Sequence, residues 1–207
     1  MVARPRGKVV PRSGILGRMP ANTPASGELP TPRQPVGTYK ICLVCLGNIC
    51  RSPMAEIVLR DELARAGLAG KVSVESAGTG DWHVGERMYA AARQELARRG
   101  YDGSGHRARQ IQPSWLASYD LVVAMDRANL AALAEMDPAA QAEGRIRLLR
   151  SFDPALTAQD AYHGDVPDPY GGSPGDFERA FDLIRDGARA LAARLAALPG
   201  VPEPERT

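Results

Sequence analysis

The chain has 207 residues, of which 44% are hydrophobic, enough for one globular domain with a core of ordinary size. No stretch approaches the roughly 18 apolar residues of a membrane span or holds the apolar centre of a secretory signal, which argues against a membrane or exported protein. Three cysteines, all within residues 42–50, cannot cross-link a secreted fold, so we expect a cytoplasmic location.

The first 37 residues differ from the rest in composition. They hold seven of the 17 prolines and show no apolar periodicity, so burial would not offset the entropy lost on ordering them. Their net charge is +5, against −3 for the remainder. We expect residues 1–37 to be a disordered basic arm that aids solubility, with neither nucleic acid nor a membrane as partner.

The first predicted element is a buried strand at residues 41–44, whose residues are Ile, Cys, Leu and Val. A glycine-containing loop follows and ends at Ser52-Pro53, after which residues 54–60 look helical. Pro53 suits a first helical turn, because its missing N–H leaves no bond unmade there. The loop should therefore lie at a helix N-terminus, where free N–H groups and the positive end of the helix dipole favour an anion such as phosphate.

Cys45 and Arg51 flank this loop with five residues between them. A thiol at a helix N-terminus beside an arginine is favoured as the thiolate, which can attack phosphorus and form a phosphocysteine. The planar guanidinium can hold two phosphate oxygens while the N–H groups of residues 46–51 hold the rest. With 23 Arg and three Cys, chance alone gives about 0.3 such pairs, so the strand, loop and helix around the pair carry the argument. We expect a phosphatase that needs no metal or other cofactor.

Later patterns complete the fold. Strands are predicted at residues 72–76, 121–125 and 146–149. Helices are predicted at about 88–99, between the strand at 121–125 and about residue 136, and at 174–196. Four strands, each followed by a crossover, indicate a doubly wound α/β fold, a four-stranded parallel sheet with helices on both faces. Six apolar side chains form one buried stripe on the last helix: Phe177, Phe181, Ile184, Ala188, Leu191 and Leu195. We assign the domain to residues 38–197 and expect residues 198–207 to fray.

Residues 44–53, Val-Cys-Leu-Gly-Asn-Ile-Cys-Arg-Ser-Pro, resemble the signature loop of the low-molecular-weight protein tyrosine phosphatases, in their bacterial, actinobacterial-like form. Asp168-Pro169-Tyr170 is similar to the acid loop of that family, and the match spans about residues 39–197. The resemblance implies a flavodoxin-like fold of the phosphotyrosine phosphatase I type and hydrolysis of phosphotyrosine in proteins. It assigns Asp168 as the general acid and base that works with Cys45 and Arg51.

The resemblance also implies supporting roles. Substrate contacts fall on Leu46, Gly47, Asn48, Ile49, Cys50 and Ser52, with Trp82 and Tyr170 as aromatic walls. A network that holds the loop falls on Asn48, Ser52, Ser76 and His106, with Asp126 and Asn129 nearby. The implied partners are phosphotyrosine-containing proteins, and small aryl phosphates in vitro. Gly171 departs from the family pattern, because many members have a second tyrosine there.

Three alternatives stay open at this stage. Arsenate reductase uses the same fold, but it relays a disulfide through downstream cysteines, and this chain has none after Cys50. A phosphotyrosine-binding module without activity would be expected to lose a catalytic residue. The Cys42-x-x-Cys45 spacing suggests zinc or thiol exchange, but two further zinc ligands are missing. Separately, Cys45 and Cys50 lie close enough in sequence for a reversible regulatory disulfide.

Overall fold

The computed structural model describes residues 28–34, 37–157, 159–160 and 164–199. Its centre is a parallel sheet of four strands in the order β2-β1-β3-β4. The strands are β1 (Tyr39–Cys45), β2 (Val72–Gly78), β3 (Leu121–Ala124) and β4 (Ile146–Leu148). The predicted doubly wound α/β fold is confirmed.

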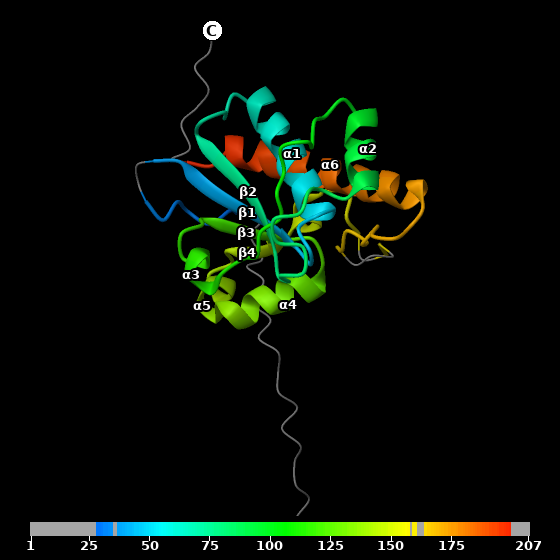
Figure 1. Cartoon of the computed structure of the whole chain (residues 1–207). Helices are drawn as coiled ribbons and strands as arrows, with labels where there is room; N and C mark the ends of the chain where they lie inside the picture. Colours follow the sequence, from blue (N-terminus) through cyan, green and yellow to red (C-terminus); the bar gives the residue numbers. More distant parts are fainter. Residues whose placement is uncertain (1–27, 35–36, 158, 161–163, 200–207) are drawn as a thin grey trace, which may run out of the picture.

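Helices cover both faces of the sheet (Figure 1). One face carries α1 (Arg51–Arg65), α2 (Ala90–Arg98) and α6 (Pro174–Ala196), with the short 3₁₀ helix η1 (Leu149–Phe152). The other carries α3 (Pro113–Leu116), α4 (Arg127–Met136) and α5 (Pro138–Ala142). The side chains of β1 alternate between two apolar clusters, as the strand period of two requires: Ile41 and Leu43 join the first cluster, Cys42 and Val44 the second.

The last helix matches its prediction, with all six residues of the expected stripe buried. Its start is fixed locally by a capping box. The side chain of Ser173 accepts a hydrogen bond from the backbone amide of Asp176, and the side chain of Asp176 accepts one from the backbone amide of Ser173. The three shortest helices, α3, α5 and η1, are not indicated by the sequence pattern. Each has only four or five residues, which is too short for a helical period to register.

The prediction of a disordered arm up to residue 37 is wrong for residues 28–34, which pack against the sheet. Leu29 is only 7% exposed, and the amide of Arg33 donates to Asp120 Oδ1 at 2.6 Å. The compositional argument misses this because a single apolar anchor shows no periodicity. Residues 1–27, 35–36 and 200–207, which hold most of the rest of the predicted arm and of the predicted frayed tail, lie outside the described residues.

The strand order places the site. β1 is followed by α1 and β2 on one side and pairs with β3 on the other, so the direction of strand addition reverses beside β1. Ligands of such sheets bind beyond the carboxyl ends of the strands at this reversal. Cys45 is the last residue of β1. None of the described helices is long and apolar enough to cross a membrane.

Candidate active site

The loop between β1 and α1 turns its carbonyl groups outward. Four carbonyl oxygens, that of Cys45 at the end of β1 and three within the loop, accept hydrogen bonds of 2.7 to 2.9 Å from groups outside the loop. The pairs are Cys45 with the amide of Thr79, Leu46 with that of Gly80, Asn48 with His106 Nε2, and Ile49 with the amide of Tyr89. Within the described chain, no acceptor is found for four loop amides, those of Leu46, Gly47, Ile49 and Cys50. These donors, at the N-terminus of α1, are available to an oxyanion.

Asn48 fixes the shape of the loop from inside. It is fully buried and has a φ of 54°, the left-handed conformation that asparagine tolerates better than most residues. Its Nδ2 donates to Ser52 Oγ and to Ser76 Oγ, both at 2.9 Å, and its Oδ1 accepts from the amide of Arg109 at 2.9 Å. Gly78 lies so close that a Cβ there would meet Leu46 O at 2.7 Å, so this position must stay a glycine.

The Cys45 thiol has two hydrogen-bonding neighbours within its own loop and the start of α1. Its Sγ lies 3.0 Å from Ser52 Oγ and accepts from the amide of Asn48 at 3.3 Å. Burial raises the pKa of Cys42 to about 12 and likewise raises that of Cys50 far above its ordinary value. Those two thiols are therefore protonated at neutral pH and poor nucleophiles. All three cysteines are free.

Arg51 is buried and joins the two carboxylates of the site. Its Nη1 donates to Asp126 Oδ2 at 2.5 Å and to Val166 O at 3.2 Å, while its Nη2 donates to Asp168 Oδ2 at 2.6 Å. Burial alone would lower the pKa of Arg51, but the nearby Cys45 and Asp168 charges and the bond to Asp126 outweigh it and raise the pKa. The buried Nε of Arg51 has no hydrogen-bond partner among the described residues. It is a donor that a bound oxyanion would satisfy.

The segment that carries Asp168 is anchored at its start. The amide of Val166 donates to Met125 O at 2.7 Å, just past the end of β3. After the carboxylate, the amide of Tyr170 donates back to Asp168 Oδ1 at 3.3 Å, a local turn that orients the acid. The Asp168 side chain is 40% exposed, so it faces both Arg51 and solvent.

Cys45, Arg51 and Asp168 line one cavity of about 160 Å³. Its mouth is formed by Trp82 and Tyr170, whose side chains are among the exposed large apolar groups of the surface, at 67% and 56%. The sequence-predicted loop residues Leu46, Gly47, Ile49 and Cys50 line it too, together with His83, which the sequence did not indicate. The Cys45 sulfur and two aromatic side chains, those of Trp82 and Tyr170, thus line the same pocket. Among the described residues, no cluster of His, Cys, Asp or Glu could hold a metal ion.

Comparison with known proteins agrees with this geometry. The model of the low molecular weight phosphotyrosine protein phosphatase family matches residues 40–198. The chain belongs to this family. It is 46% identical over 156 residues to the low molecular weight protein-tyrosine-phosphatase of Streptomyces coelicolor, covering 75% of this chain and 93% of that protein. It is 43% identical over 152 residues to phosphatase A of Mycobacterium tuberculosis, covering 73% and 88%.

Solved structures give the same result. The crystal structure of YfkJ from Bacillus subtilis superposes with a TM-score of 0.69 at 36% identity and covers 78% of this chain and 97% of that one. A tyrosine phosphatase from Entamoeba histolytica gives a TM-score of 0.71 at 31% identity, covering 77% and 98%. The predicted membership is confirmed, and this low-molecular-weight phosphatase is a protein-tyrosine-phosphatase, EC 3.1.3.48.

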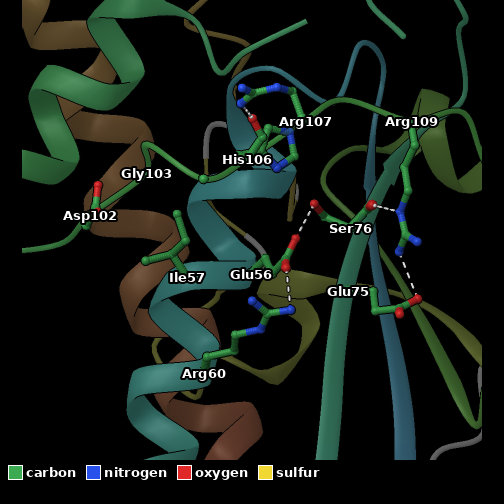
Figure 2. Close-up of a pocket in the computed structure, with 11 residues that line it drawn as sticks. Glu56, Ile57, Arg60, Glu75, Ser76, Asp102, Gly103, His106, Arg107 and Arg109 are labelled. Atoms are coloured by element: carbon green, nitrogen blue, oxygen red, sulfur yellow. Dashed lines mark hydrogen bonds and ion pairs between the residues drawn. The ribbon is translucent and has the colours of Figure 1, made fainter. Parts of the chain in front are cut away.

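Behind the catalytic loop of this low-molecular-weight phosphatase lies a second, polar cavity of about 470 Å³ (Figure 2). Ser76 on β2 donates to Glu56 Oε2 on α1, and Glu56 Oε1 accepts from Arg60 at 2.6 Å. His106 Nε2 bonds the carbonyl oxygen of Asn48 in the loop. Because a carbonyl oxygen only accepts, the proton of the neutral imidazole must be on Nε2. Burial lowers the pKa of His106, so the ring is neutral at pH 7.

The structure brings together most of the predicted supporting residues. Ser52, Ser76 and His106 all bond Asn48, as expected from the resemblance, and Asp126 bonds Arg51. Asn129 is different. Its backbone amide donates to Asp126 Oδ1, a bond by which Asp126 caps α4. The buried side-chain Oδ1 of Asn129 has no hydrogen-bond partner among the described residues.

Two contributors to the network are missed by sequence reasoning. Glu56 looks like half of an ordinary i,i+4 surface pair with Arg60, and nothing local signals its bond to Ser76 on another element. Arg109 contributes through its backbone amide, which no residue type encodes, while its guanidinium pairs with Glu75 at 2.8 Å.

Proposed function

We propose that this phosphatase hydrolyses phosphotyrosine through a phosphocysteine on Cys45. In the first step the sulfur anion attacks phosphorus and the bond between phosphorus and the tyrosine oxygen breaks. The electron pair of that bond goes to the phenolic oxygen, which takes the proton of Asp168. The observation that carries this proposal is that one buried guanidinium, on Arg51, stands in a single cavity with the thiol and bonds the carboxylate directly.

In the second step water attacks the phosphorus of the phosphocysteine and gives a proton to the Asp168 carboxylate. The sulfur–phosphorus bond breaks, sulfur leaves as the anion, and inorganic phosphate is released. Asp168 thereby returns to its acid form for the next turnover. Ser52 Oγ, 3.0 Å from the sulfur, is placed to donate to it as it leaves.

Arg51 changes partners during this cycle in our proposal. Without phosphate, its Nη2 bonds Asp168 and its Nε bonds nothing in the described chain. A phosphoryl group in the loop would accept from both nitrogens, together with the four free amides, and would release Asp168 toward the leaving group. Asp126 keeps its bond to Nη1 and so holds the guanidinium in place. Donors set in advance around the equatorial oxygens supply most of the stabilisation of the transition state.

The pocket favours aryl phosphates. Trp82 and Tyr170 present flat faces at the mouth, and the sulfur lies at the base, so a phosphate on a rigid aromatic ring reaches it while a phosphoserine is too short. Tyr170 is itself held by Tyr89, with ring centroids 5.0 Å apart. Phosphotyrosine-containing proteins are the proposed substrates, with small aryl phosphates as their counterparts in vitro. A cytoplasmic location belongs to the same proposal, because a catalytic thiol needs reducing surroundings.

The test is turnover of p-nitrophenyl phosphate and of a phosphotyrosine peptide with chelator present. Cys45→Ser should abolish both activities. Cys42→Ser is the matched control, since it makes the same exchange in the same strand on the opposite face, and it should retain activity. Full activity in Cys45→Ser would reject the nucleophile.

Phosphoarginine is the competing substrate to include, because one matched structure at 27% identity and TM-score 0.68 is the arginine phosphatase YwlE. We expect the aromatic walls to favour phosphotyrosine in kcat/KM. A preference for phosphoarginine would reject the proposed role of Trp82 and Tyr170 as substrate walls.

A further inference from the structure

We propose that the amino end of the sheet carries a binding site for an extended, proline-containing peptide, and that residues 28–34 of this chain fill it. We call residues 28–34, Glu-Leu-Pro-Thr-Pro-Arg-Gln, the clasp. The clasp precedes the family match, which begins at residue 40, so it is an addition to the domain. Its site lies at the other end of the sheet from the catalytic loop.

Leu29 is the anchor of the clasp. It is 7% exposed and joins the apolar cluster that fills the α1 and α6 face of the sheet. The next residue, Pro30, has its carbonyl oxygen bonded by the hydroxyl of Tyr39 at 3.0 Å, and Tyr39 is itself only 2% exposed. An apolar side chain in the core, followed by a carbonyl bonded to a buried hydroxyl, is a fixed contact of the kind that recognises peptides.

Two arginines at the start of β4 bond the clasp through its backbone. Arg147 Nη2 donates to the carbonyl of Glu28 at 2.7 Å, and Arg145 Nη1 donates to that of Thr31 at 3.2 Å. Burial lowers the pKa of Arg147, which is expected of a guanidinium held at a protein contact. The domain therefore offers donors where the clasp offers carbonyls.

Asp120, just before β3, closes the other end of the clasp. This carboxylate is 5% exposed and accepts from the amide of Arg33 at 2.6 Å and from the amide of Lys40 at 2.7 Å. The side chain of Arg33 also donates from Nε to the carbonyl of Tyr119 at 3.0 Å. One buried carboxylate thus joins the clasp to the first strand of the sheet.

The sequence of the clasp suits this site. Proline has no N–H, so at Pro30 and Pro32 the backbone presents acceptors only, which suits the part of the site where Tyr39, Arg145 and Arg147 are the donors. Residues that precede proline are biased to extended conformations, which lowers the entropy lost on docking. The same combination of a stiff proline segment and a site that bonds its carbonyls is used to bind proline-rich ligands in trans.

The position of the site separates it from catalysis. Tyr39 is the first residue of β1 and Cys45 the last, and a strand of seven residues spans roughly 20 Å. In Figure 1 the blue clasp lies at the left, where β1 begins. We therefore expect changes in the clasp to alter stability and leave turnover unchanged.

The first experiment compares thermal unfolding of the full chain with Leu29→Ala and with Thr31→Ala. Leu29→Ala should lower Tm by about 4 to 8 °C, because it empties the anchor position. Thr31→Ala is the matched control, since its exposed side chain is absent from the contacts above and its carbonyl is retained. Both variants should keep kcat/KM on p-nitrophenyl phosphate within about twofold of the wild type. Equal Tm values for the two variants would overturn the proposal.

The second experiment asks whether the site binds a peptide in trans. A synthetic peptide of residues 28–34 at millimolar concentration should restore part of the Tm lost in full-chain Leu29→Ala, and the same peptide with alanine in place of Leu29 should not. Hydrogen exchange should show the Arg33 amide protected in the wild type and in Thr31→Ala, and exposed in Leu29→Ala. No recovery with the wild-type peptide, or no protection of Arg33, would reject a peptide-binding site.

Discussion

Replacing Asn48 separates the two tasks of that residue, which are to bond the loop and to adopt a left-handed conformation. Asn48→Ala removes three side-chain hydrogen bonds of 2.9 Å, two donated to Ser52 and Ser76 and one accepted from Arg109. At about 1 kcal/mol each, their loss lowers the free energy of unfolding by about 3 kcal/mol. The φ of 54° adds roughly 1 kcal/mol for an alanine, so the total is about 4 kcal/mol.

Asn48→Gly is the informative comparison. It loses the same three hydrogen bonds, but a glycine adopts a positive φ without strain. The greater freedom of glycine in the unfolded chain offsets part of that advantage. We therefore expect Asn48→Gly to be more stable than Asn48→Ala by about 0.5 kcal/mol, although glycine is usually the less stable of the two.

The assay is urea unfolding at pH 7, with the slope of the transition checked for equality between variants. Turnover of p-nitrophenyl phosphate should fall in both variants, because the amides and the sulfur are oriented by the same residue. If Asn48→Ala is as stable as Asn48→Gly, the left-handed conformation contributes nothing and the reasoning fails.

Three further predictions concern the titrating groups of the site. Asp168→Ala should slow phenyl phosphate about 10- to 100-fold more than p-nitrophenyl phosphate in steady-state assays, because only the poor leaving group needs a proton; equal slowing contradicts the acid role. Burial lowers the pKa of His106 in the folded state below the ordinary 6.5, so its contribution to stability is complete above about pH 6.5 and declines as pH falls below it. His106→Gln should flatten that part of a urea-midpoint profile, and an unchanged profile counts against a buried neutral ring. At pH 7 iodoacetamide should modify Cys45, with phosphate protecting it, while mass mapping should find Cys42 and Cys50 unmodified until the protein unfolds. Modification of all three at one rate would contradict the raised pKa values of Cys42 and Cys50.

The residues close to Cys45 and Arg51 in the sequence are sufficient to predict the strand, loop and helix that hold this pair. A buried strand, a helix start marked by Pro53 and a thiol with an arginine near each other in sequence leave few other arrangements. The stripe on α6 was equally local, since its spacing reports which face is buried. Asp168 was assigned by resemblance alone, because an Asp-Pro pair is common in turns.

The tertiary structure decided which distant groups meet. The bond between Arg51 and Asp168 joins positions 117 apart, and it exists because Val166 is tied to the end of β3, next to the end of β1. Glu56 gained its role from the packing of α1 against β2, and Leu29 gained its role from packing into the apolar cluster on the α1 and α6 face of the sheet. Patterns along the chain report periodicity and caps, which are local properties. Contacts between elements depend on strand order and register, and the sequence fixes these only through the whole set of packed side chains.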